Sequence, residues 1–226
     1  MYSSVRDAFY DFNLPFEGVV QWMYLDIKGL VTIGLGNLID PVKRVLDLEL
    51  PFEYIDRPGS QATQDEIIDA WKTVKSKTSL KYKGYKAFEK LTNIRLTEDA
   101  IRSLVDTQLV ANEQVLKKTF SNFDNWPADA QLGLLSMAWA LGAGFASKWP
   151  KFRTACQNED WDTAAQECLI SEVGNLGVKP RNNANQTLFS NAARVQELSD
   201  SFEYQPEVLY YPAVILPEVV VTSNAG

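Results

Sequence analysis

Hydrophobic periodicity changes from helical to extended within the first forty residues. Apolar side chains recur every three or four positions over residues 5–12, after two serines that can cap a helix, and we expect Pro15 to end that helix. Two β-branched and aromatic runs, 18–25 and 30–36, then flank Asp-Ile-Lys-Gly at 26–29, which is typical of a turn. This pattern predicts a short helix followed by a β-hairpin.

From about residue 63 the apolar spacing becomes helical. Thr63 and Glu66 have the spacing of a capping box, and Thr97 precedes a second amphipathic stretch. Residues 132–141 are apolar nearly all round after Pro127 and end at glycine, which predicts a buried central helix. Further helices are expected over residues 150–157, 161–171 and 183–199.

These patterns predict an α+β protein with one domain, residues 1–204. A small lobe of about residues 14–62 holds the hairpin, and a larger all-helical lobe spans about 63–204 together with the N-terminal helix. Prolines at positions 206, 212 and 217 exclude a helix in the tail, 205–226, and favour extended structure. Two interpretations of this tail stay open: a segment docked on the domain surface, or a strand that binds a partner or joins a longer polyprotein.

Composition excludes several classes of function. The 226 residues include no histidine, which rules out Ser-His, Cys-His and His-metal mechanisms. A net charge of −7 offers no basic surface for nucleic acid or an anionic membrane. No apolar segment is long enough to span a bilayer, and the first residues do not form a signal peptide, so we expect a soluble, monomeric chain made in the cytoplasm.

Five residues near the hairpin carry the main functional signal. Glu17, Asp26, Thr32, Gly34 and Gly36 follow the pattern Glu-x8-Asp-x5-Thr-x-Gly-x-Gly. Taken singly, each residue has an ordinary explanation: Glu17 is a solvated carboxylate, Asp26 forms a turn, and Thr32 suits a strand. The two glycines would each mark a bend in the backbone. The whole pattern arises by chance on the order of once in several thousand chains of this composition. It resembles the signature of the bacteriophage-type lysozymes, glycoside hydrolase family 24.

The resemblance extends over roughly residues 5–200. Gly142-x-Gly144-Phe145, then Trp161-Asp162-x-Ala164-Ala165, then Pro180-Arg181-Asn182-Asn183 look like the landmarks of the family's helical lobe, in the same order. The stretch of about 40–97 is longer than in short members, and the tail has no counterpart. The family implies a lysozyme-like fold and hydrolysis of the β-1,4 bond between N-acetylmuramic acid and N-acetylglucosamine in peptidoglycan, without a metal or organic cofactor.

The family also implies a role for each carboxylate. Glu17 would be the general acid, and its pKa would have to be raised for it to hold a proton near neutral pH. Asp26 would stay ionised, stabilise positive charge on the sugar and help to activate water, which Thr32 would hold. Water attack, with no covalent intermediate, fits the inverting stereochemistry usually described for the family.

Further positions are expected to bind substrate. Gly34 and Gly36 allow close approach of the backbone, and Asn37 stands where many relatives have histidine, so any proton role there is lost. Arg181 would steer Glu17 or the substrate, unless it is an ordinary surface arginine. Trp22 would offer a platform for a sugar ring, unless it packs in the core.

The chain is acidic, whereas a free wall-degrading enzyme would bind the anionic cell wall better with a cationic surface. An antibacterial toxin of the type VI effector kind, or a phage tail-associated lysozyme, fits it better than a free endolysin. Such a protein would act on the periplasmic cell wall of a target bacterium, with an immunity protein or a delivery-machine component as its partner. The alternatives are an inactive peptidoglycan-binding module of the same fold and a lytic transglycosylase.

Cys156 and Cys168 are expected to be buried thiols, with a disulfide as the other option.

Overall fold

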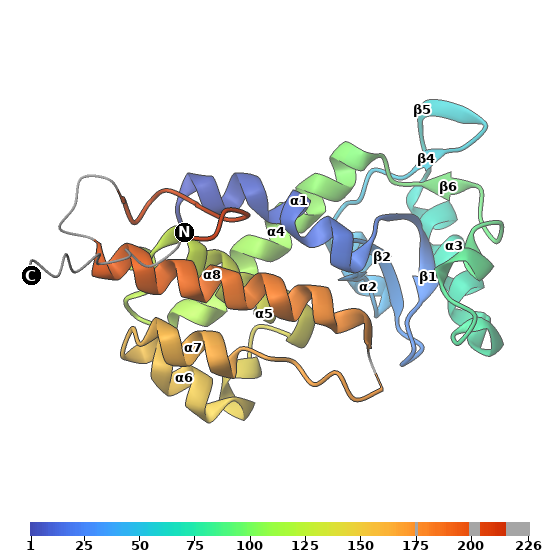
Figure 1. Cartoon of the computed structure of the whole chain (residues 1–226). Helices are drawn as coiled ribbons and strands as arrows, with labels where there is room; N and C mark the ends of the chain where they lie inside the picture. The colour runs from blue at the N-terminus through green and yellow to red at the C-terminus, as the bar shows by residue number, and fades with distance from the viewer. Residues whose placement is uncertain (175, 199–203, 216–226) are drawn as a thin grey trace, which may run out of the picture. The chain divides into compact units, whose positions relative to one another are not determined.

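The computed structural model describes residues 1–174, 176–198 and 204–215, and within them the protein is α+β, with eight α-helices and two small antiparallel sheets (Figure 1). The residues group by their contacts into two units. The hairpin unit is Tyr10–Gln108, and the helical unit is Met1–Phe9 with Leu109–Gly226. Residues 63–108, expected in the helical lobe, group with the hairpin instead. None of the described helices is long and apolar enough to cross a membrane.

Helix α1 runs over Ser3–Glu17, two residues beyond the proline that was expected to end it. Pro15 lies in the last turn, where a missing N–H removes only one helical hydrogen bond. The helix ends at Gly18, whose φ of 69° is the left-handed conformation typical of a helix C-terminus. The Gly18 N–H closes the last turn by donating to the Leu14 carbonyl, 2.9 Å away. Glu17 is therefore the last helical residue.

The first sheet contains the predicted hairpin. It comprises β1 (Val20–Leu25), β2 (Val31–Gly34) and the two-residue β3 (Asn37–Leu38), in the order β1-β2-β3. Tyr24 lies directly opposite Thr32 in the β1–β2 pair. Along β1 the side chains alternate: Met23 and Leu25 are buried, whereas Trp22 and Tyr24 are half-buried. One face of β1 thus carries two aromatic rings next to the hairpin turn.

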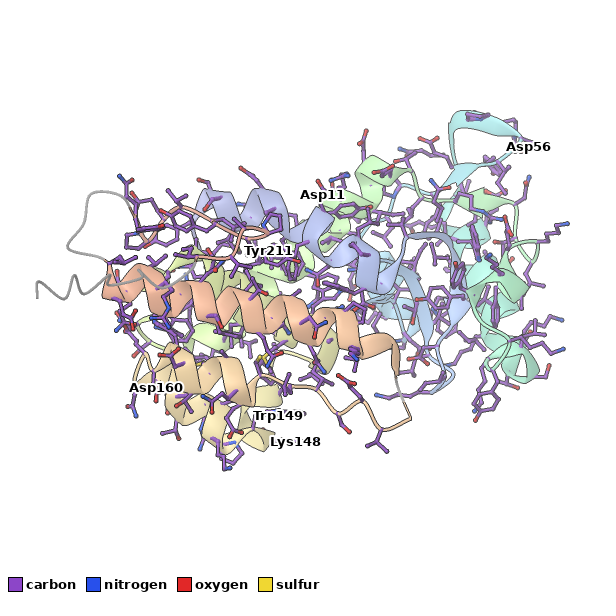
Figure 2. The ribbon with its side chains drawn as sticks, in the orientation of Figure 1. Asp11, Asp56, Lys148, Trp149, Asp160 and Tyr211 are labelled. Carbon is purple, nitrogen blue, oxygen red and sulfur yellow. The ribbon has the colours of Figure 1, made fainter. Side chains whose placement is uncertain are left out.

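The remainder of the hairpin unit packs around this sheet. It comprises α2 (Val42–Asp47), β4 (Glu53–Tyr54), β5 (Arg57–Gln61), α3 (Gln64–Ser76), the 3₁₀ turns η1 (Thr78–Leu80) and η2 (Tyr85–Phe88), and β6 (Ile94–Arg95). The second sheet has the order β5-β4-β6, and Figure 2 labels Asp56 in its β4–β5 turn. The capping box predicted at Thr63 is present. Lys75, near the end of α3, donates to the Gly29 carbonyl (2.8 Å) and to Asp40 Oδ2 (2.6 Å), which ties α3 to the hairpin turn.

The helical unit is built on a buried central helix. Its elements are the C-terminal part of α4 (Glu98–Lys117), η3 (Phe123–Asn125), α5 (Ala128–Leu141), η4 (Phe145–Lys148), α6 (Pro150–Gln157), α7 (Trp161–Glu167), η5 (Leu176–Val178) and α8 (Lys179–Glu197). As predicted, α5 is buried over most of its length, and it packs on α8, which also contacts α7 (Figure 1). Helix α7 ends four residues earlier than expected. Helix α8 begins four residues earlier, because Pro180 is well suited to a first turn.

Helix α7 of this unit has a side-chain N-cap, and the two cysteines of the unit are buried. Asp160, labelled in Figure 2, caps α7 by accepting a hydrogen bond from the Thr163 N–H at 3.0 Å. Cys156 and Cys168 are buried free thiols. Burial raises the pKa of Cys168 to about 12 and that of Cys156 well above its ordinary value. Both therefore act as small hydrophobic side chains.

A buried carboxylate organises the described part of the C-terminal segment, residues 204–215. Asp129 of α5 accepts hydrogen bonds from the backbone N–H groups of Tyr210 (2.9 Å) and Tyr211 (3.1 Å) and from Asn191 Nδ2 (2.9 Å). Asn191 in turn bonds both Ala213 and Ile215. Residues 204–215 contain turns and neither a helix nor a strand, and Figure 2 labels Tyr211 among them. The last part of the predicted extended tail, 216–226, lies outside the described residues.

We expect Asp129→Ala to destabilise the protein by about 3 kcal/mol, because one buried and two part-buried donors lose their acceptor. Burial raises the pKa of Asp129 against the opposing effect of these hydrogen bonds. Its contribution to stability is therefore greatest when the carboxyl is protonated and falls as pH rises through the raised pKa. In urea unfolding, Asp129→Ala should accordingly lower the free energy of unfolding more at pH 4 than at pH 7. Glu207→Ala, an exposed change of equal charge, should alter stability by no more than about 0.5 kcal/mol; equal effects of the two variants would contradict the anchoring role.

Candidate active site

Glu17 lies against the glycine loop that follows β2. A Cβ atom at Gly36 would lie 3.5 Å from Glu17 Oε2, so the carboxylate of α1 passes directly over the backbone of this loop. Gly36 is exposed and has a φ of 83°, a conformation that side-chain-bearing residues rarely adopt. The loop therefore needs glycine here for its backbone conformation, and a side chain at this position would contact the carboxylate.

Asp26 is fixed in the hairpin turn by its own backbone neighbours. Its Oδ1 accepts hydrogen bonds from the N–H groups of Lys28 (2.9 Å) and Leu30 (2.8 Å), and its backbone pairs with Leu30. Among the described residues no group donates to Oδ2. The side chain is half-buried. The turn thus holds one oxygen rigidly and leaves the other for a ligand or water.

Thr32 stands on β2, opposite Tyr24 of β1. The residue is buried, and its Oγ1 donates to the Leu30 carbonyl at 3.2 Å. Because the hydroxyl hydrogen is used in this bond, the oxygen is left as an acceptor. Leu30 therefore links the two side chains: its N–H binds the Asp26 carboxylate, and its carbonyl orients the Thr32 hydroxyl.

Tyr24 is affected by the charge of both carboxylates. Burial first, and then the negative charges of Glu17 and Asp26 and the nearby Tyr85, together raise the pKa of Tyr24 to about 12. The phenol therefore stays protonated. Sequence reasoning missed Tyr24, although its position two residues before Asp26 on the half-buried face of β1 was a usable signal. It also missed Tyr85, for which no local signal exists.

The glycine loop is ordered from beneath by Asn37. Its Oδ1 accepts the Leu35 N–H at 3.1 Å, and a Cβ atom at Gly34 would lie only 2.9 Å from the same oxygen. Asn37 is buried, and its Nδ2 has no hydrogen-bond partner within the described residues. These contacts support a positioning role for Gly34 and Asn37; direct substrate contact by either remains a prediction.

Two further predicted binding residues lie in different units. Trp22 is half-buried on β1 and donates from Nε1 to the Tyr85 carbonyl at 2.9 Å. Arg181 belongs to α8 of the helical unit, is 3% exposed, and donates to the carbonyl (3.0 Å) and hydroxyl (3.1 Å) of Ser136. The interpretation of Arg181 as an ordinary surface arginine is therefore wrong, since the guanidinium is enclosed by the helices. Its action on Glu17 or substrate remains a prediction.

We expect Gly36→Ala to lower activity more than stability. The added methyl group would contact Glu17 Oε2, and the positive φ adds about 1 kcal/mol of strain. Gly59→Ala is a matched control, because Gly59 has the same φ of 83° with no atom near its Cβ position. Comparable loss of stability in both variants, with the activity of this candidate site lost only in Gly36→Ala, would support this geometry. Equal activity of the two variants would contradict it.

No protein-family model matches the chain, and no curated protein matches it. The relation to the phage-type lysozymes therefore stays a prediction from the residue spacing.

Proposed function

We propose that this protein is a muramidase that cleaves the β-1,4 bond between N-acetylmuramic acid and N-acetylglucosamine in peptidoglycan. The observation that carries this proposal is the position of the Glu17 carboxylate over the Gly36 loop that follows β2, while Leu30, just before β2, holds both the Asp26 carboxylate and the Thr32 hydroxyl. Glycoside hydrolysis requires two carboxyl groups with distinct environments and roles. Here one carboxyl ends a helix and the other is held in a tight turn.

Glu17 is assigned as the general acid. Its carboxyl is exposed, ends α1 and lies over the backbone of Gly36. In the protonated form it would donate its proton to the glycosidic oxygen as the bond to the muramic acid C1 breaks. The leaving N-acetylglucosamine then departs as an alcohol, and the Glu17 carboxylate recovers a proton from solvent.

Asp26 and Thr32 are assigned to the nucleophilic water. Asp26 Oδ2 and Thr32 Oγ1 are both acceptors, because Asp26 Oδ1 and the Thr32 hydroxyl hydrogen are already used within the turn. Two acceptors can hold the two hydrogens of one water and leave its lone pair directed at C1. As water adds, Asp26 would take the released proton, and its negative charge would stabilise the oxocarbenium-like transition state.

The proposed setting is that of an antibacterial effector domain or a phage lytic enzyme acting on the cell wall of a target bacterium. The net charge of −7 would oppose unaided binding to an anionic wall, which favours placement by a delivery machine. In the effector case an immunity protein would protect the producing cell.

Dye-labelled, purified sacculi test the proposal. The full-length protein should release soluble dye progressively, whereas a catalytically inactive peptidoglycan-binding module would sediment with the sacculi and leave the dye in the pellet. Folding is checked on the same sample by circular dichroism. Folded protein that binds sacculi for hours without releasing dye would contradict the hydrolase assignment and leave the binding module.

A further inference from the structure

An exposed aromatic side chain from the long 40–97 stretch lies beside the two aromatic rings of β1. Tyr85 begins η2 immediately after Gly84, whose φ of 74° turns the chain toward β1. Phe88, at the other end of η2, is fully buried and anchors the turn. The Tyr85 side chain nevertheless remains 41% exposed. It is therefore a fixed aromatic surface rather than a part of the core.

The Tyr85 ring joins the two rings on β1. Its centroid lies 6.0 Å from that of Trp22 and 6.2 Å from that of Tyr24, and its backbone carbonyl accepts the Trp22 indole N–H. Behind Trp22, the Arg95 guanidinium lies 5.2 Å from the ring centroid. Tyr24 lies opposite Thr32 in the sheet and two residues before Asp26 in the chain, so the three rings form a surface that leads from this end of β1 onto η2.

The charge of this region is opposite to that of the whole protein. The net charge is −7, yet residues 75–95 contain seven lysines and arginines and a single acidic residue, Glu89. Lys83 and Lys86 flank Tyr85 closely in sequence and are exposed. Within the part of the chain that the structure describes, neither takes part in an ion pair. Two ammonium groups are thus available to an anionic ligand next to the aromatic surface.

We propose that Tyr85, Trp22, Lys83 and Lys86 form a peptide-stem subsite, which binds the saccharide unit of peptidoglycan that carries a peptide. This inference rests on the proposed function and names the part of the substrate that the site selects. The apolar face of a pyranose ring would pack on Tyr85 and Trp22, as sugars do on exposed aromatic rings. The carboxylates of the attached peptide would pair with Lys83 and Lys86. The enzyme should accordingly prefer peptide-bearing glycan to bare glycan.

Two measurements on the full-length protein test the subsite: solubilisation kinetics for intact sacculi, and binding to sacculi by Glu17→Gln proteins. Tyr85→Ala should raise KM about tenfold and leave kcat within about twofold of the wild type. In the Glu17→Gln background it should weaken binding to sacculi by the same factor of about ten. Tyr82→Ala is the matched control, because Tyr82 is 77% exposed on the same segment and stacks with Lys81 rather than with the β1 rings. Tyr85→Phe, which keeps the ring, should behave nearly as the wild type.

The lysines are tested with two substrates. Lys83→Gln/Lys86→Gln should weaken binding to intact sacculi severalfold and leave binding to amidase-treated, peptide-free glycan strands unchanged. If Tyr85→Ala matches Tyr82→Ala while the wild type still releases dye, the subsite is wrong and the muramidase proposal stands. If the wild type releases no dye but binds sacculi in a Tyr85-dependent way, the muramidase proposal fails and the subsite stands. If the wild type neither releases dye nor binds sacculi, the muramidase proposal and the subsite are both overturned.

Discussion

Replacing Glu17 with glutamine should slow the solubilisation of sacculi by about 10³-fold. The amide keeps the shape of the side chain above Gly36 but has no acidic proton for the glycosidic oxygen. Since Glu17 is exposed at the end of α1, the melting temperature and circular dichroism should be close to those of the wild type. Initial rates of dye release, measured at saturating sacculi, give the effect directly.

Glu49→Gln is the matched control for this loss. Glu49 is also exposed and belongs to the same unit, after α2, and its replacement removes an equal charge at a residue with no assigned role in the site. It should retain full activity. A Glu17→Gln protein that keeps more than about one tenth of the wild-type rate would remove Glu17 from the role of general acid.

Asp26→Asn should lower the rate by about 10²-fold without unfolding the hairpin turn. The amide oxygen can still accept the N–H groups of Lys28 and Leu30, which Asp26 Oδ1 accepts in the wild type. What is lost is the negative charge and the second acceptor, Oδ2, that would orient the water. The predicted signature is a fall in kcat with KM nearly unchanged, because the lost interaction acts in the transition state.

The structural control for Asp26 is its replacement by alanine. Asp26→Ala also removes the acceptor for two backbone N–H groups, so it should destabilise the turn by about 1–2 kcal/mol in addition to lowering activity. If Asp26→Asn loses as much stability as Asp26→Ala, its loss of activity reflects the turn, and the assignment of Asp26 to water activation fails.

Local sequence patterns predicted those parts of the fold that are stabilised by local contacts. The hairpin, the capping box at Thr63 and the buried α5 each depend on residues within one element or its immediate neighbours. The sheet β5-β4-β6 was missed because β4 and β6 have two residues each, too few to show a period. Pro15 was given too much weight, since its position in the last turn of α1 leaves the helix nearly intact.

The residues of the candidate site also fall into those that local sequence could indicate and those that depend on contacts between distant elements. Glu17, Asp26 and Thr32 could be selected as candidates because their spacing along one short stretch of chain resembles a family signature. Tyr85 could not, since it reaches Trp22 and Tyr24 only through the packing of η2 on β1, about sixty residues away in sequence. The burial of Arg181 was likewise invisible, because its partner Ser136 lies on another helix. Contacts between distant elements have no signature in a single sequence.

The most direct test of the account is the chemistry of the ends that the protein creates. Muropeptides released from purified sacculi by the wild type, and by Glu17→Gln as the inactive control, are reduced with borohydride and identified by mass spectrometry. The account predicts new reducible N-acetylmuramic acid ends from the wild type alone. Reducible N-acetylglucosamine ends, 1,6-anhydro ends, or muramic acid ends formed equally by Glu17→Gln would contradict it.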